Sequence, residues 1–343
     1  MRSGSFTRAA LASGLVLVVT AACIGTEADR SSTPNHGTAA PAYPARWSVG
    51  APGVQPYAQS DPSLPVPAGY TVVGPSNASS KEYDLYSCSG TTNIDHKYFR
   101  AYLYIGTGCH GTINITNSII APPAGSANRA ILVNSDSSGP LTLNISDSTI
   151  RPEPVPVGGT NAALNDHAIN DCATCTIHLN RVDVANTGGM CECGHNTLIE
   201  NSWLHDNYIA NLSDPSLAHT GGVFPYGGSG PVEISHCRLE PGINAATGQP
   251  VPNYWQAITA VLFTQSTGGS TLRNYQVHDN FISLGAYDMD LEDGSGLSIT
   301  NNVFGPNHWG QASSTSNVTF TNWSGNVAGD LAGQPIQTSV PRP

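Results

Sequence analysis

The chain has 343 residues, of which 11% are charged, with 13 Lys and Arg against 24 Asp and Glu. Because like charges repel, the net charge of −11 argues against nucleic acid as a partner and against unaided binding of any polyanion. Gly, Asn, Ser and Thr are abundant, so the surface relies on hydroxyls and amides.

The first 23 residues have the features of a secretory signal. Arg2 and Arg8 precede an apolar stretch, residues 9–22, that is too short to span a bilayer and ends in small residues. The run TAAC ending at Cys23 resembles a bacterial lipoprotein signal, and simple cleavage is the alternative. We expect a protein that is secreted or anchored to the outer face of the bacterial cell envelope, with a lipid on Cys23 as its only membrane attachment.

Residues 24–65 are rich in Pro, Ala, Ser and Thr and show no apolar periodicity, which is typical of a flexible, disordered tether. No second linker interrupts residues 66–340, and their number is enough for a substantial core. We expect these residues to form a single, monomeric domain.

A short pattern recurs along this domain, with two apolar residues alternating with polar ones, then an Asn-like residue and a later apolar one. Examples are INITNSII at 113–120, IHLNRVDV at 177–184 and VEISHCRL at 232–239. The second apolar residue of each copy serves as a marker, and the markers are Ile115, Ile145, Leu179, Ile199, Ile234, Val277, Ile299 and Phe320.

This alternation predicts short strands with one buried face. One such strand in 20-odd residues cannot bury its own apolar face, so the copies must stack, with two or three strands per repeat. The prediction is an all-β fold, a parallel β-solenoid. A β-sandwich is the alternative, but its hairpins would not repeat an Asn at a fixed position. Asn tolerates the left-handed conformation of corners, and this column is Asn117, Asp147, Asn180, Asn201, His236, Asp279, Asn301 and Asn322.

Eight cysteines in an exported chain predict disulfides. We expect Cys88 to pair with Cys109 and Cys237 to be the unpaired thiol. The other four cysteines are expected to form two disulfides that staple adjacent repeats, and a zinc site is the alternative for them. They are Cys172, Cys175, Cys191 and Cys193.

The repeats resemble those of the pectate-lyase-like superfamily, which implies a right-handed parallel β-helix. The segments NSWLHDN at 201–207, HTGGVF at 219–224, ITAVLFTQ at 258–265 and NNVFGPNHWG at 301–310 are similar in order and spacing to those of a group of exported bacterial members. Those relatives often carry an Asp where this chain has Gly221. Members include polysaccharide lyases, hydrolases and epimerases, so the resemblance does not fix a reaction.

The sharpest local signal is YDMDLED at 287–293, in which acidic and apolar residues alternate. On a strand, alternate side chains project from one face about 7 Å apart. Carboxylates this close repel one another unless a hard cation lies among them or one is protonated. We expect Met289 inside, and Asp288 and Asp290 on the exposed face, with Asp293 completing a Ca²⁺ site. A solvated strand face is the alternative.

Counting from the markers places this acidic strand beside Val223 and Val261 of preceding repeats. Aromatic rings beside carboxylates suit sugar rings, and long insertions can form the wall of a groove. Packing of these rings over the insertions is the alternative. The expected substrate-binding residues are Phe224, Tyr226, Tyr254 and Trp255.

Two histidines are the expected catalytic residues, because a His next to a carboxylate can act as a general base. His205 stands beside Asp206, and stacking would bring His219 of the next repeat close to it. Hydrogen bonding at a corner is the alternative for both histidines. Arg273 is expected to neutralise a uronate or to serve as the base, as an arginine does in some relatives, with a strand-edge salt bridge as the alternative.

These features predict an exported carbohydrate-active protein that takes a polysaccharide as partner and no nucleic acid. The leading interpretation is a polysaccharide lyase in which Ca²⁺ bridges an acidic glycan to an acidic protein. A glycoside hydrolase that uses two of the same carboxylates is one alternative. A β-helical surface protein that binds a glycan without catalysis is the other.

Overall fold

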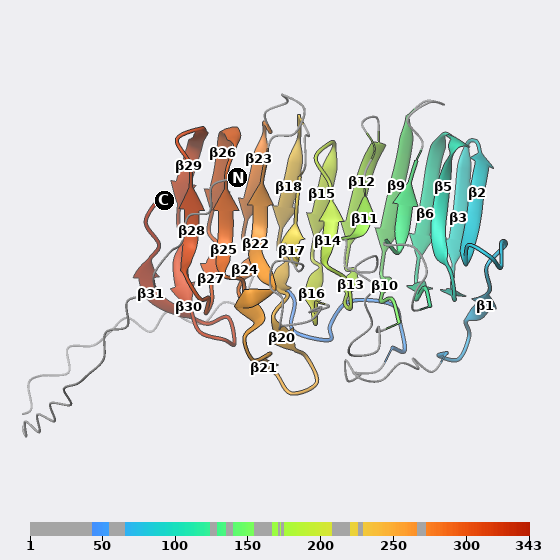
Figure 1. Cartoon of the computed structure of the whole chain (residues 1–343), viewed down its shortest axis with the longest axis horizontal. Coiled ribbons are helices and arrows are strands. Elements are labelled where there is room, and N and C mark those ends of the chain that lie inside the picture. Colours follow the sequence, from blue (N-terminus) through green and yellow to red (C-terminus); the bar gives the residue numbers. More distant parts are fainter. Residues whose placement is uncertain are drawn as a thin grey trace, which may run out of the picture. The chain divides into compact units, whose positions relative to one another are not determined.

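The computed structural model describes residues 43–54, 66–123, 129–134, 140–153, 167–170, 172, 175–207, 220–225, 229–265 and 272–343. These residues form β-strands, turns and one short 3₁₀ helix, η3 (Tyr254–Gln256). Three parallel sheets, A, B and C, contain most of the strands (Figure 1). None of the described helices is long and apolar enough to cross a membrane.

The strands of each sheet lie side by side in chain order. Sheet A contains β1 (Thr71–Val73), β4 (Lys97–Phe99), β7 (Ile119–Ile120), β10 (Thr149–Ile150), β13 (Asp183–Val184), β16 (Trp203–His205), β19 (Arg238–Glu240), β24 (Phe281–Ile282), β27 (Val303–Phe304), β30 (Val327–Gly329) and the antiparallel β31 (Pro335–Ser339). Sheet B contains β2 (Glu82–Cys88), β5 (Tyr102–Cys109), β8 (Ile131–Val133), β11 (His167–Asn170), β14 (Gly189–Glu192), β17 (Thr220–Val223), β22 (Ile258–Thr264), β25 (Tyr287–Leu291) and β28 (Gly310–Ser314). Sheet C contains β3 (Thr91–Asp95), β6 (Gly111–Thr116), β9 (Leu141–Ser146), β12 (Cys175–Asn180), β15 (Thr197–Glu200), β18 (Val232–Ser235), β23 (Tyr275–His278), β26 (Gly294–Thr300) and β29 (Val318–Ser324). A small hairpin joins β20 (Ile243–Asn244) to β21 (Gln249–Pro250).

The strand register confirms the sequence repeat. In sheet C each marker from Ile115 to Val277 pairs with the marker of the next repeat. The prediction for the last marker, Phe320, is wrong. The register shifts between β26 and β29, so Ile299 pairs with Trp323 instead. Each repeat contributes one strand to each sheet, at the upper end of the predicted two or three strands.

The apolar residues of all three sheets form one main core. Ile105 of β5, Ile115 of β6 and Ile120 of β7 belong to the same buried cluster, as does Ile199. Alternate residues of the sheet C strands point into this core, and the residues between them face outward. The outer faces of the sheets are therefore the surfaces on which function can lie.

Most of the predicted Asn column occupies left-handed corners, as expected from the tolerance of Asn for positive φ. The prediction is wrong at two positions, where Arg181 (φ 56°) and Gly325 (φ 68°) take the corner instead of Asn180 and Asn322. The guanidinium of Arg181 donates two hydrogen bonds of 2.6 Å to Asp147 of the preceding repeat. The six confirmed positions are Asn117, Asp147, Asn201, His236, Asp279 and Asn301.

Directly after each of these corners, a buried polar column runs through the core. The Nδ2 groups of Asn280 and Asn302 donate to Oδ1 of Asn302 and Asn326, at 3.0 and 3.1 Å. Cys237 stands in the same column, and its backbone N–H donates to Asn280 Oδ1 at 2.8 Å. Cys237 is buried and is the free cysteine among the described residues, as predicted.

The disulfide between Cys88 and Cys109 joins β2 to β5, and the prediction for this pair is confirmed. The other four cysteines were expected to staple adjacent repeats. Instead, each disulfide lies within one repeat, and the pairs are Cys172 with Cys175 and Cys191 with Cys193.

Residues 43–54, which we call the strap, lie along the outer face of sheet A. The prediction of a tether is wrong for them, although residues 24–42 and 55–65 lie outside the described residues. The Arg46 guanidinium binds both carboxylate oxygens of the buried Glu240 at 2.7 Å. The strap runs from the C-terminal repeats towards the N-terminal ones, with ring or backbone contacts of Tyr43 with Phe281, Trp47 with Trp203, and Ala51 with Thr149.

Candidate functional site

The acidic segment forms β25, which lies between β22 and β28 in sheet B. The prediction is confirmed for Val261, which lies on the paired strand β22, while Val223 lies on β17, one strand further away. Met289 faces the core as expected. The prediction that Asp288 lies on the exposed face is wrong, because Asp288 is completely buried. It lies one residue before Met289, opposite Val261, whose side chain also belongs to the core. Strict alternation therefore fails where the strand begins.

Asp288 is a buried carboxyl with only part of its hydrogen bonding satisfied. Asn307 Nδ2 donates to its Oδ2 at 3.0 Å, and its Oδ1 has no hydrogen-bond partner among the described residues. Burial raises the pKa of Asp288 well above its ordinary value, although hydrogen bonds from Asn307 and the Gly285 backbone oppose this. The neutral acid is therefore favoured at this position.

Replacing Asp288 with Asn is expected to stabilise the protein at neutral pH. A carboxyl whose pKa is raised by folding makes stability fall as pH rises above the unfolded pKa of about 4. The measurement is the melting temperature of the native protein and of the variant at about pH 4 and about pH 8. The two melting temperatures should be equal at the lower pH, and that of the variant should be higher at the higher pH. Asp290→Asn, at a half-buried position, should show a smaller gain. A lower melting temperature for Asp288→Asn at both pH values would show that the carboxylate is needed in its charged form.

The other two predicted calcium ligands lie in different surroundings. Asp290 is half-buried on the outer face, and burial raises its pKa, an effect opposed by Ser313 and reinforced by the charge of Glu292. Asp293 lies in the turn after β25. Calcium needs six to eight oxygen ligands, but the described residues contain no group of His, Cys, Asp or Glu suited to a metal ion. The residues present do not fit the predicted Ca²⁺.

Four aromatic side chains form a surface at the beginning of β25, which we call the aromatic platform: Trp255, Tyr287, His308 and Trp309. Trp255 and His308 stack with ring centres 3.9 Å apart and an interplanar angle of 4°. The Trp309 ring lies 5.5 Å from Tyr287 and 6.4 Å from Trp255. Trp309 is 58% exposed, so the platform has an open face.

Three separate segments build the platform. The insertion between sheets A and B supplies Trp255 on η3, while Tyr287 begins β25. His308 and Trp309 precede β28, in the next repeat, and their backbone N–H groups donate to Gly285 and Ala286 at 3.3 and 2.7 Å. The sequence interpretation included the NHWG segment only in the family resemblance, and its Trp and His were not recognised as site residues.

The four predicted aromatic ligands have different roles. Trp255 belongs to the platform. Phe224 is almost fully buried and packs against Phe263, with ring centres 5.1 Å apart, so the packing alternative holds for it. Burial and the nearby charge of Asp288 raise the pKa of Tyr254 to about 12. Tyr226 lies outside the described residues.

The structure brings His205 and Asp206 together, but in a buried site. His205 Nδ1 lies 2.6 Å from Asp206 Oδ2, and its Nε2 lies 2.7 Å from Oδ1 of Asp183, a partner that the sequence did not reveal. The imidazole is completely buried and stacks on Trp203, with Trp47 of the strap at its edge. The arrangement holds a buried charge network and presents no open surface to a substrate. His219 lies outside the described residues.

Arg273 is exposed just before β23, a strand of sheet C, and it forms a parallel bridge with Ser295. It therefore lies at the corner after sheet B and not among the platform residues.

No protein-family model, curated protein or solved structure matches the chain.

Proposed function

We propose that the chain is an exported right-handed parallel β-helix of the pectate-lyase-like type. The support is the repetition of three parallel strands per repeat, with the sheet C strands in register from β3 to β26, and Asn-rich corners. Export is supported by the signal-like residues 1–23.

The function that the geometry supports best is binding of a neutral polysaccharide across the aromatic platform. The observation that carries this proposal is the exposure of Trp309, beside Tyr287 and the Trp255–His308 stack. Large aromatic side chains bury much area on binding, and grouped exposed ones mark interaction sites. Their rigid flat faces match the apolar faces of sugar rings.

The charge beside the platform favours a neutral glycan over an acidic one. Asp290 lies on β25, the strand that supplies Tyr287, and Glu292 follows the end of this strand, so a uronate placed along it would face two carboxyl groups. A calcium-dependent lyase would need a bridging cation, and the described carboxylates do not gather to hold one. Lyase action on an acidic glycan is therefore the weaker proposal.

Hydrolysis of the bound glycan is the second candidate function. The raised pKa of Asp290 suits a general acid, and Glu292 is two residues further along. Glu292 lies just beyond the end of β25, where Gln265 Nε2 donates to its Oε2 at 2.9 Å, and it is the candidate for the second carboxylate that an inverting glycosidase uses as general base.

Trp309→Ala is expected to weaken glycan binding at least about tenfold, because a stacking aromatic ring contributes one to several kcal/mol. The measurement is isothermal titration or affinity electrophoresis with a panel of neutral and acidic polysaccharides. Tyr86→Ala is the matched control, since Tyr86 is 55% exposed on β2 of the same sheet, at its other end.

The products distinguish the candidate reactions. New reducing ends without ultraviolet absorbance indicate a hydrolase, which Asp290→Asn should inactivate. Unsaturated sugar ends indicate a lyase. Equal binding by the native protein, Trp309→Ala and Tyr86→Ala would remove the platform from consideration.

A further inference from the structure

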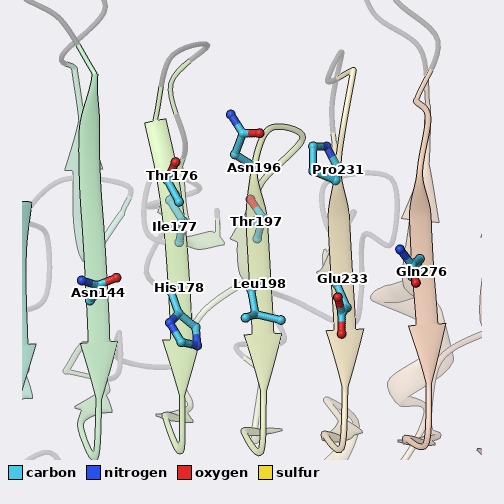
Figure 2. A pocket seen from close by; sticks show the side chains of 10 residues that line it. All are labelled: Asn144, Thr176, Ile177, His178, Asn196, Thr197, Leu198, Pro231, Glu233 and Gln276. Atoms are coloured by element: carbon cyan, nitrogen blue, oxygen red, sulfur yellow. The ribbon is translucent and has the colours of Figure 1, made fainter.

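A groove of about 420 Å³ crosses the outer face of sheet C, away from the residues of the platform. Its lining residues lie on β9, β12, β15, β18 and β23 or in the turns just before them, and Figure 2 shows His178, Leu198 and Glu233 in one row. The register confirms this row, because His178 pairs with Leu198 and Leu198 with Glu233. The groove is within the usual size range for small ligands.

The row changes character where it enters the groove. On the N-terminal side it is an amide ladder, in which Asn144 Nδ2 donates to Asn114 Oδ1 at 2.9 Å and Asn114 Nδ2 to Asn93 Oδ1 at 2.8 Å. In the groove the ladder is replaced by His178, a half-buried Leu198 and Glu233. An apolar side chain on this outward face contributes nothing to the core, so its position is free to serve a ligand.

Two histidines on this face each lie within hydrogen-bonding distance of a glutamate. His178 Nε2 lies 2.8 Å from Glu200 Oε1, towards one side, and His278 Nε2 lies 3.2 Å from Glu233 Oε1, towards the other. His278 Nδ1 is itself 2.8 Å from Asp279 Oδ2. These side chains are 26 to 42% exposed, so they reach solvent while their orientation is fixed.

The groove therefore has an apolar floor and one oriented carboxylate, that of Glu233, and its lining contains no cationic side chain other than histidine. Glu233 uses one oxygen for His278, and its other oxygen has no hydrogen bond to any described residue. Amide groups of Asn144 and Gln276 lie at the two ends. Such a lining repels anions and suits a cationic hydrogen-bond donor beside an apolar face.

We propose that this groove is a second binding site, for a ligand that carries a primary ammonium group next to an apolar or sugar-ring surface. The ammonium binds the free oxygen of Glu233, and the apolar surface lies on Leu198. The proposal does not depend on the aromatic platform, because no residue is common to the two sites.

The test is calorimetric titration of the full chain with a glucosamine trisaccharide, its N-acetylated form and putrescine. The proposal is supported if the glucosamine trisaccharide binds and its N-acetylated form does not. Putrescine binding as tightly would show that the ammonium suffices, and weaker putrescine binding would show that the sugar face contributes. Glu233→Gln should reduce the affinity about tenfold or more, and added salt should also reduce it.

Leu198→Asn replaces the apolar side chain between His178 and Glu233 with an amide, so it should weaken binding while leaving the melting temperature unchanged. Ser298→Ala is the matched control, because Ser298 follows Gln276 in the same row but lies outside the groove. Trp309→Ala should leave amine binding intact, which separates this proposal from the glycan site. The proposal is overturned if no amine binds at millimolar concentration, or if Glu233→Gln binds as the native protein does.

Discussion

Ile199→Asp is expected to unfold the domain. Ile199 is completely buried, and it pairs with Leu179 and Ile234 in the central column of sheet C. An aspartate there would place in the core either an unpaired charge or, with its pKa raised, a neutral acid without hydrogen-bond partners. Either state costs several kcal/mol of stability. That is comparable to the whole stability of many domains, about 5 to 15 kcal/mol.

Circular dichroism and a thermal melt measure this outcome. Leu198→Asp is the matched control, since the neighbouring residue has a similar side chain but faces outward in the groove. It should fold and melt within a few degrees of the native protein. A stable Ile199→Asp protein would contradict the register of sheet C.

Stability is also expected to fall between about pH 6.5 and pH 9 because of His205. Burial alone would lower the pKa of His205, but the charges and hydrogen bonds of Asp183 and Asp206 raise it to about 9. A histidine whose pKa is raised by folding contributes stability below its unfolded pKa, and this is lost as pH rises through the folded pKa. The loss is on the order of 3 kcal/mol, since one pKa unit corresponds to about 1.4 kcal/mol.

Denaturant melts at several pH values up to about 9.5 measure this loss, and they stop below the ordinary tyrosine and lysine pKa values of about 10. Asp183→Asn removes one of the two carboxylates, so the variant should be less stable near pH 6 and should lose less stability by pH 9. A native protein equally stable at both pH values would show that His205 is neutral in the folded state.

The repeat in the sequence was sufficient to predict the strands and most of their register. Alternating Ile, Val and Leu at fixed positions leaves one face to bury, and a shift by one residue would expose it. Prediction failed at corners and ends, where the period of two does not apply. Asp288 is an example, because it follows a turn and shares the buried row of Val261.

The sites were harder to predict than the strands, because they depend on contacts between distant segments. Trp255 and His308 stack although they are 53 positions apart in the sequence, and no local pattern indicates that contact. The groove residues were hidden inside the structural repeat, where His178 and Glu233 occupy ordinary outward positions. His205 was recognised beside Asp206, but the strap that covers it has the composition of a linker.

The course of the strap determines where tension enters the domain. Tyr43, the first described residue, packs at Phe281 among the C-terminal repeats, and later strap residues contact β19, β16 and β10 in turn. In a protein held at a cell surface through Cys23, a pull on the chain would arrive at that end and run lengthwise along the strap. The Arg46–Glu240 pair and the Trp47 contacts would then be loaded in shear, before any strand of the three sheets is peeled away.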